Sequence, residues 1–256
     1  MLGAIAGDIF GAAYEHRAFK RDDFDLFDAA RLFTDDTVLT VATADALLTD
    51  GDYAAAYRLW GNRFPGRGYG GWFLDWLGDP SSGPYNSFGN GSAMRVSPIG
   101  WAFDTLEEVL AESERSAAVT HNHPEGIKGA QATAAAIHLA RMGATKDEIR
   151  HEISSRFAYN LDRTVQQIRP DYSFDVTCQG SVPEALIAFL DADDFEHTLR
   201  LAISLGGDAD TQAAIAGGVA EAFWGGLPER IEVEVRDVLD PALLGVVDRF
   251  NEMMRG

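Results

Sequence analysis

The sequence predicts an all-α fold, and three features of its pattern support this prediction. Apolar residues recur at helical spacing through most of the chain, capping signals precede several of these stretches, and strand-like alternation is rare. The 256 residues, 46% of them hydrophobic, suffice for one large core. Because no Ser/Pro-rich linker or low-complexity tract divides the chain, we expect a single domain over residues 1–256.

The N-terminal part of the chain contains three predicted helices. Residues 2–15 are rich in Ala and Gly, which predicts a helix that packs closely against a neighbour. Residues 38–48 predict a second helix of Ala, Leu and Val. Tyr53, Tyr57 and Trp60 fall at i, i+4 and i+7, a spacing that places them on one face of a third helix.

Capping boxes, in which a Ser or Thr is followed three residues later by Glu, predict three helix starts in the middle of the chain. They are Thr105 with Glu108, Thr145 with Glu148, and Ser181 with Glu184, the last with Pro183 just inside the helix. An Ala-rich helix over residues 127–141 follows His123-Pro124, and either Asn122 or His123 is a candidate cap.

Helices also dominate the C-terminal part. Residues 195–203 and 211–224 predict helices on either side of an acidic cluster, and residues 243–254 predict a last amphipathic helix. Residues 231–235 alternate like a strand but also fit a helix, which we prefer in this context. Residues 61–101 and 160–180 lack periodicity, and loops of this length usually carry function.

The charge and cysteine content limit the classes of function. The formal net charge is −19, with 40 acidic and 21 basic residues, so the surface repels nucleic acid and anionic membranes. Cys178 is the only cysteine, and residues 1–6 lack the basic start of a signal peptide. Because a single cysteine cannot form an intrachain disulfide, we expect a cytoplasmic protein. No apolar stretch is long enough to span a membrane, and the charged exposed faces of the helices predict a monomer.

Two acidic clusters carry the strongest chemical signal. Thr34, Asp35 and Asp36 precede one predicted helix, and residues 206–211 with Asp208, Asp210 and Thr211 precede another. Carboxylate and hydroxyl oxygens are the ligands that Mg²⁺ and Mn²⁺ prefer, so two converging clusters suit a metal-assisted hydrolase. The alternative interpretation is that these residues only cap helices, since Thr and Asp favour that position.

Three further patterns are weaker. The turn formed by Gly89-Asn90-Gly91-Ser92 presents backbone N–H groups suited to a phosphate, although an ordinary surface turn has the same composition. His121 is a candidate donor to a substrate or phosphate oxygen. Trp72 and Trp76 are able to stack on a purine, but we expect them to be core residues beneath a glycine-rich loop.

Six motifs occur in order along nearly the whole chain. They are Gly7-Asp8-x-x-Gly11-x-x-x-Glu15, Thr34-Asp35-Asp36-Thr37, Gly89-Asn90-Gly91-Ser92-Ala93-Met94-Arg95, Thr120-His121, Val182-Pro183-Glu184-Ala185, and Ser204-Leu205-Gly206-Gly207-Asp208-Ala209-Asp210-Thr211. No single motif is decisive. Together they resemble the ADP-ribosylglycohydrolases of the dinitrogenase reductase-activating glycohydrolase type.

The resemblance implies an all-α domain with a binuclear Mg²⁺ or Mn²⁺ centre that removes ADP-ribose from modified side chains. The implied metal ligands are Thr34, Asp35, Asp36, Asp208, Asp210 and Thr211, with Asp210 as the bridge. Glu15, at the entrance, joins Asp35 and Asp36 as a candidate acid or base. The implied substrate-binding residues are Asn86, Ser87, Phe88, Gly89, Asn90 and Gly91, whose backbone donors cradle the diphosphate, and His121.

The resemblance leaves the acceptor and the class of protein open. Phe88 stands where relatives often place Tyr, and no residue marks the acceptor linkage. The acidic surface favours an arginine-linked acceptor weakly over a serine-linked one. The alternatives are a non-catalytic ADP-ribose-binding or crystallin-like member of the family, and a dinuclear-metal phosphohydrolase. The complete set of candidate ligands argues against a member that has lost activity.

Overall fold

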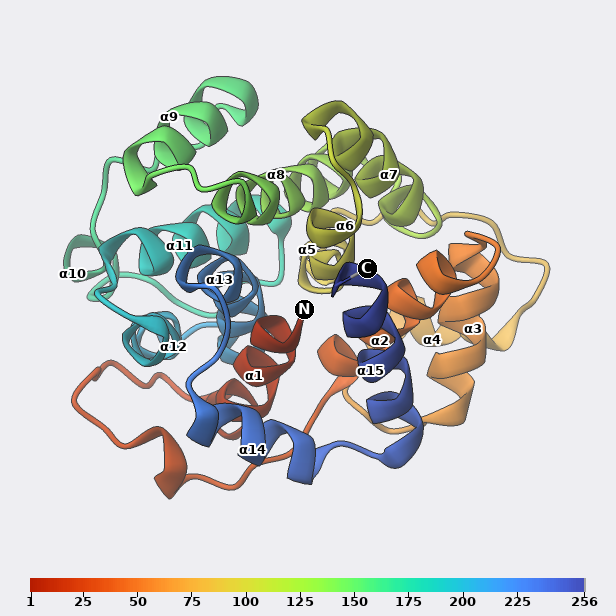
Figure 1. The fold of residues 1–256 in the computed structure, drawn as a ribbon, viewed down its shortest axis with the longest axis horizontal. Helices are drawn as coiled ribbons and strands as arrows, with labels where there is room; N and C mark the ends of the chain where they lie inside the picture. Colours follow the sequence, from red (N-terminus) through yellow and green to blue (C-terminus); the bar gives the residue numbers. More distant parts are fainter. Residues whose placement is uncertain (256) are drawn as a thin grey trace.

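The computed structural model describes residues 1–255, and helices form all of its regular structure apart from one isolated bridge between Gly89 and Thr177 (Figure 1). The α-helices are α1 Leu2–Gly11, α2 Asp35–Leu48, α3 Tyr53–Arg63, α4 Gly71–Gly78, α5 Gly91–Met94, α6 Ser97–Ala102, α7 Leu106–Ala118, α8 Pro124–Arg141, α9 Lys146–Phe157, α10 Val165–Ile168, α11 Cys178–Asp191, α12 Phe195–Ser204, α13 Ala209–Trp224, α14 Glu229–Val238 and α15 Pro241–Arg255. The all-α prediction is confirmed.

Helix α13 lies at the centre of the fold. All its residues up to Ala222 are buried, and α1, α8, α11 and α12 pack around it. On the other side, α2 lies between α3 and α15 and also contacts α1 (Figure 1). The buried apolar side chains of these helices belong to one hydrophobic cluster. Helices α2 and α13, whose N-termini carry the acidic clusters, are therefore both parts of this core.

Most helices predicted from periodicity are present, and two of the three predicted capping boxes are confirmed. Thr105 with Glu108 and Thr145 with Glu148 form both hydrogen bonds of the box. Residues 231–235 lie within α14, so the helical interpretation of that segment is correct. Among residues 1–255, no helix combines the length and the apolar character needed to cross a bilayer.

The capping box predicted at Ser181 is wrong. Helix α11 already begins at Cys178, because the Thr177 side chain accepts a hydrogen bond from the Gly180 N–H, and Pro183 lies inside the helix. The Ser181 hydroxyl donates to the Asp175 carbonyl, and the Glu184 carboxylate pairs with Arg163. Both side chains of the expected box thus serve tertiary contacts that the local sequence does not reveal.

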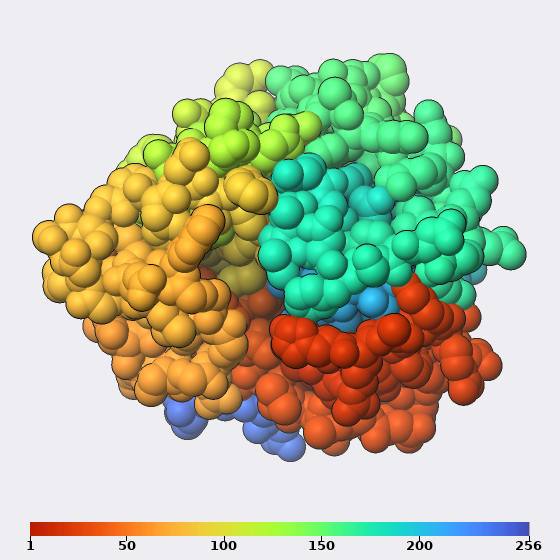
Figure 2. All heavy atoms as spheres, turned by 180° about the vertical axis from the view of Figure 1, so that it is seen from behind, coloured from red at the N-terminus to blue at the C-terminus, as the bar shows by residue number. Residues whose placement is uncertain are grey.

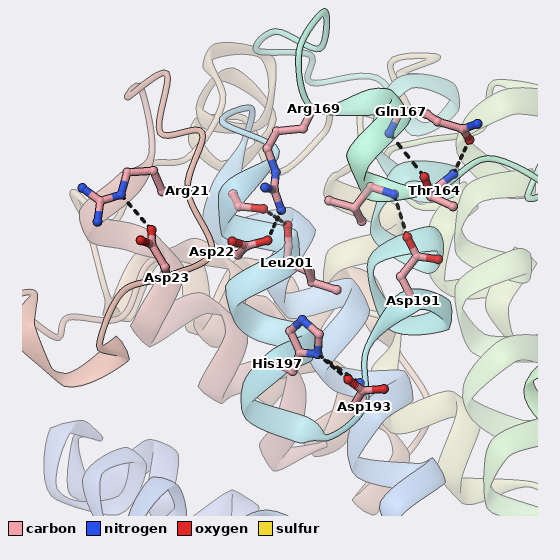
Figure 3. Close-up of polar contacts among 12 residues, drawn as sticks. Arg21, Asp22, Asp23, Thr164, Gln167, Arg169, Asp191, Asp193, His197 and Leu201 are labelled. Atoms are coloured by element: carbon pink, nitrogen blue, oxygen red, sulfur yellow. Dashed lines mark hydrogen bonds and ion pairs between the residues drawn. The ribbon is translucent and has the colours of Figure 1, made fainter.

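The two stretches without periodicity contain short helices rather than continuous loops. Residues 61–101 include α4, α5 and α6, and residues 160–180 include α10. A third capping box, Thr164 with Gln167, starts α10 (Figure 3). Beside it, Arg169 pairs with Asp22 and so attaches the segment between α1 and α2 to α10 (Figure 3). These helices are too short to produce a periodic signal.

Candidate metal centre and ligand cavity

The structure brings the two acidic clusters together at the N-termini of α2 and α13. Thr211 Oγ1 lies 3.3 Å from Asp36 Oδ2, although 175 residues separate them in the chain. Carboxylate oxygens gather there in two groups whose members lie within 4.8 Å of one another, one made of Asp8, Asp36 and Asp210, the other of Glu15, Asp208 and Asp210. Asp210 belongs to both groups, which is the arrangement that a carboxylate shared by two metal ions requires.

Glycines in α1 make this convergence possible. A Cβ atom on Gly7 would lie 2.0 Å from the Ala213 carbonyl oxygen, and one on Gly11 would lie 2.6 Å from the Asp210 Cα. Only glycine permits so close an approach of two helix backbones. The predicted close packing of the first helix is thus confirmed, and it places Asp8 against the first turn of α13.

Asp8 is a site residue that the sequence reasoning missed. It is fully buried, and its carboxylate accepts hydrogen bonds from the Thr34 N–H at 2.9 Å, the Thr34 hydroxyl at 2.7 Å and the Thr37 N–H at 3.0 Å. Asp8 therefore fixes the start of α2 from outside that helix. The available signal was a single carboxylate inside an otherwise apolar helix, since a buried charge needs partners.

The helix-cap interpretation holds for the first acidic cluster only in part. Thr34 is the N-cap of α2, and its hydroxyl accepts a hydrogen bond from the Asp36 N–H. Asp208 occupies the N-cap position of α13 but makes no capping hydrogen bond. Its Oδ2 instead accepts a hydrogen bond of 2.7 Å from the Asn90 side-chain amide. Capping therefore does not account for the second cluster.

The carboxylates of the centre repel one another. Burial is the main reason that the pKa values of Asp36 and Asp210 lie well above the usual range, and neighbouring carboxylates raise them further. Burial, followed by the charge of Asp8, raises the pKa of Asp35 to about 8. Asp36 Oδ1 is buried without a hydrogen-bond partner. Buried carboxylates that lie this close together, one of them with an unpartnered oxygen, are suited to binding cations.

Glu15 lies at the edge of this centre, after the 3₁₀ turn Ala12–Tyr14 that follows α1. Its carboxylate lies 3.1 Å from His16 Nε2, and it is partly exposed. Burial is the main cause that raises the pKa of Glu15; the charge of His16 lowers it, and that of Asp208 raises it. The neighbouring His16 has φ 58° and lies against the Phe174 ring.

A cavity of about 530 Å³ opens onto the acidic centre. Figure 2 shows its face of the molecule, where the orange-to-gold, teal and red parts of the chain meet around a recess. The predicted site residues that line it are Glu15, Asp35, Asp36, Ser87, Phe88, Gly89, Asn90, Gly91, His121, Asp208, Asp210 and Thr211. Thr34 and Asn86 are not among the lining residues. The volume suits a ligand of the size of a nucleotide.

The glycine-rich turn forms one wall of the cavity, but much of its backbone is already bonded within the protein. The N–H groups of Asn86, Gly89 and Asn90 donate to the Asn122 side chain, the Ser87 hydroxyl and the Val176 carbonyl, respectively. Among residues 1–255, the Phe88 and Gly91 N–H groups have no such partner. A bound phosphate would therefore meet fewer free donors than the sequence alone indicates.

The two tryptophans of α4 have different environments. Trp76 is buried, as expected of a core residue. Trp72 is 62% exposed and lines the cavity, so its expected place in the core is wrong. Trp72 lies in the first turn of α4, Gly71–Gly78, and meets the Tyr85 ring beside the cavity, whereas Trp76 packs against Phe73 and the Arg58 guanidinium.

Comparison with known proteins gives consistent results. The sequence profile of the ADP-ribosylglycohydrolase family matches residues 1–256. The chain is 27% identical to ADP-ribosylhydrolase ARH3 of Danio rerio, over 88% of this chain and 81% of the relative. It is 29% identical to ADP-ribosylarginine hydrolase Tri1 of Pseudomonas putida, over 89% of this chain and 71% of the relative.

A solved structure shows the same fold. The chain superposes on an ADP-ribosylglycohydrolase-related protein complex with a TM-score of 0.76 and 26% sequence identity, covering 99% of this chain and 95% of the other. The match therefore extends from α1 to α15 and includes both helix starts that carry the acidic clusters. With the profile match over its full length, the chain belongs to the ADP-ribosylglycohydrolase family.

Proposed function

We propose that this protein is a metal-dependent hydrolase that removes ADP-ribose from modified side chains. The observation that carries the proposal is Asp210, which two groups of carboxylates share on the wall of a cavity of about 530 Å³. The names of the relatives, ADP-ribosylhydrolase and ADP-ribosylarginine hydrolase, support the same reaction. The product is ADP-ribose, and the substrate is an ADP-ribosylated protein or a smaller ADP-ribosyl compound.

Two Mg²⁺ or Mn²⁺ ions are the proposed cofactors. Their proposed ligands are Thr34, Asp35, Asp36, Asp208, Asp210 and Thr211. The donor set is suitable because all six offer hard oxygens, and because Asp36 Oδ1 is buried without a partner. Thr34 is the weakest member, since its hydroxyl donates to Asp8 at 2.7 Å. Asp8 completes the set as an anchor for the start of α2.

Carboxylates of the chain are the proposed groups for proton transfer during bond cleavage. When bound, the ions supply a polarised water and orient the ribose hydroxyls. Glu15, Asp35 and Asp36 are the carboxylates that accept a proton from that water or return one to the leaving group. Glu15 and Asp35 both line the cavity and are partly exposed, whereas Asp36 is buried. We therefore favour Glu15 or Asp35 for proton transfer.

The remaining cavity residues hold the ADP part of the substrate. Ser87, Phe88, Gly89 and Gly91 form the wall that receives the diphosphate, with the free N–H groups of Phe88 and Gly91 as donors. Asn86 supports this wall from outside. His121 faces the same wall, since its Nε2 lies 3.2 Å from the place of a Cβ on Gly91.

The arginine linkage is favoured weakly over the serine linkage. The side chain released from an arginine linkage is a cation, and the cavity that would release it carries the carboxylates of Glu15, Asp35 and Asp208. The resemblance to a relative named ADP-ribosylarginine hydrolase points the same way, although relatives named ARH3 match equally well.

The proposal is tested with purified protein and matched peptides that carry ADP-ribose on arginine or on serine. We expect release of ADP-ribose with Mg²⁺ or Mn²⁺, none with a chelator, and none from Asp210→Asn with either ion. Tight binding of ADP-ribose without any release would instead identify a non-catalytic member of the family. Release of inorganic phosphate from a phosphoester, with no release of ADP-ribose, would identify a phosphohydrolase.

A further inference from the structure

Arg95 is a buried cation without a carboxylate partner. Its side chain follows α5 and is fully buried at the inner wall of the cavity. It takes part in none of the ion pairs found among residues 1–255. Its Nε and Nη1 have no hydrogen-bond partner, and the guanidinium lies 4.2 Å from the centre of the Tyr57 ring. A charge in such a place is unfavourable unless it serves a ligand or a neighbour.

The hydrogen bond from Arg95 to the Thr120 side chain leads toward the cavity. Arg95 Nη2 donates to Thr120 Oγ1 at 2.9 Å and to the Ser116 carbonyl at 3.3 Å. Thr120 Oγ1 in turn lies 2.7 Å from His121 Nδ1. The other ring nitrogen, Nε2, faces the glycine-rich turn, 3.2 Å from the place that a Cβ on Gly91 would occupy. The three side chains thus form one chain of contacts from the core to the cavity wall.

The donors and acceptors of this chain favour one place for the histidine proton. A guanidinium only donates, so the bond from Arg95 occupies a lone pair of Thr120 and leaves its single proton for another acceptor. His121 Nδ1 lies within hydrogen-bond distance, and when it accepts this proton it is unprotonated and Nε2 carries the hydrogen. Burial, and then the charge of Arg95, hold the pKa of His121 well below its usual range.

We propose that Arg95 and Thr120 are positioning residues that hold His121 in the neutral Nε2–H form, so that it donates to an anionic oxygen beside the glycine-rich turn. The ligand chemistry is a phosphate or diphosphate group. Only the choice of ADP-ribose as the natural ligand rests on the proposed function. The side chains of Arg95 and Thr120 act through His121 and the field of the guanidinium, since neither needs to touch the ligand.

Tyr85 offers the competing arrangement. Its hydroxyl also interacts with the Thr120 side chain, and its ring centre lies 5.9 Å from that of His121. If Thr120 donated to Tyr85, His121 would carry its hydrogen on Nδ1 and turn a bare lone pair toward the ligand. That lone pair would repel a phosphate oxygen, so the two arrangements predict opposite tautomers and opposite effects on anion binding.

Nitrogen NMR of ¹⁵N-histidine-labelled protein without ligand reads the tautomer directly. The His121 signal is assigned by its loss in His121→Gln. We expect the Nε2–H form in the wild type and in Thr120→Ser, which keeps the hydroxyl, and a mixture of tautomers in Thr120→Val. Thr133→Val is the matched control, because the Thr133 hydroxyl is buried without a partner and lies outside the cavity lining. The Nδ1–H form in the wild type would overturn the proposal.

Binding of pyrophosphate and of ADP-ribose, measured by calorimetry, tests the consequence. Loss of one oriented donor should lower the affinity of Thr120→Val for both ligands about tenfold. The affinities of Thr120→Ser and Thr133→Val should equal those of the wild type. Unchanged affinity in a folded Thr120→Val protein would refute the positioning role. If the tautomer and the pyrophosphate affinity behave as expected but no ADP-ribose is ever released, the positioning role stands and the proposed reaction fails.

Discussion

Two parts of the cavity wall hold buried charge of opposite sign: the acidic end at the starts of α2 and α13, and the basic end at Arg95. At one end, Asp8, Asp36 and Asp210 place carboxylate oxygens within 4.8 Å of one another. At the other end, Arg95 is buried without a carboxylate partner among residues 1–255. Each end is unfavourable by itself, since an uncompensated charge in the interior is expensive. Together they suit a ligand set that brings cations to the first end and an anion to the second.

This contrast explains why the two ends are built differently. The acidic end depends on two helix starts and on α1, whose glycines allow it to lie against α13. The basic end depends on a chain of side-chain hydrogen bonds, from Arg95 through Thr120 to His121. Helix packing fixes the first rigidly, whereas single hydroxyl groups orient the second. Variants at the acidic end should therefore lose metal binding, and variants at the basic end should lose affinity for ADP-ribose.

The largest effect is expected at the shared carboxylate. Asp210→Asn or Asp208→Ala should lower ADP-ribose release more than about 100-fold and abolish tight metal binding, because even residues behind a metal ligand contribute 10- to 100-fold. Helix content by circular dichroism should stay unchanged. The metal-free Asp210→Asn protein should melt at a higher temperature than the metal-free wild type, since one repelling charge is gone. A double variant with full turnover would refute the metal assignment.

A stability profile without metal tests the raised pKa of Asp35 at the acidic end. The pKa of Asp35 is raised from 3.8 to about 8, so the folded state holds its proton over that range while the unfolded state has released it. The free energy of unfolding should therefore fall as the pH rises from about 4 to about 8. In urea titrations, the free energy of unfolding should fall more with pH in the wild type than in Asp35→Asn. Saturating Mg²⁺ should remove this difference between the two proteins.

Close packing of α1 should matter to the acidic end alone. Gly7→Ala forces a Cβ to 2.0 Å from the Ala213 carbonyl oxygen, so we expect a loss of about 1–3 kcal/mol or more in the free energy of unfolding. Metal affinity should drop, because Asp8 shifts with α1. Gly245→Ala in α15 is the control: its Cβ meets nothing within 4 Å, and it should gain about 0.5–1 kcal/mol.

A variant at the basic end should change ligand binding and leave metal binding intact. Arg95→Met removes the buried charge and its bond to Thr120, and we expect ADP-ribose to bind about 10- to 100-fold more weakly. Metal binding measured without ligand should be unchanged. Loss of metal affinity in this variant, at wild-type helix content, would show that the two ends are not independent. The unfolding free energy should change little, since the lost contacts offset the lost cost of burying the charge.

The predicted helices succeeded where the signal was local. Capping boxes such as Thr105 with Glu108, and the periodic stretches of α2, α13 and α14, identify their helices within a few residues. The prediction failed at α11, whose start is set by Thr177 rather than Ser181, and in segments with short helices. There, tertiary contacts decide, and the local pattern does not contain them.

The candidate site shows the same division. The acidic clusters were recognisable because carboxylates and hydroxyls recur beside predicted helix starts. Asp8 was missed because its partners, Thr34 and Thr37, lie on another helix. The sequence also did not reveal that the Asn86 and Asn90 N–H groups of the glycine-rich turn are bonded within the protein, since their acceptors, on Asn122 and Val176, are distant in sequence. Exposure of Trp72 depends on how the start of α4 lies beside the cavity, which only the fold decides.

The most direct test of the account is ADP-ribose release from matched arginine-linked and serine-linked peptides, with Mg²⁺, with Mn²⁺ and with a chelator. We predict metal-dependent release, faster from the arginine linkage, that disappears in Asp210→Asn. Faster release from serine would correct the acceptor and leave the reaction intact. No release from either peptide by a folded protein that binds metal and ADP-ribose would contradict the proposed function.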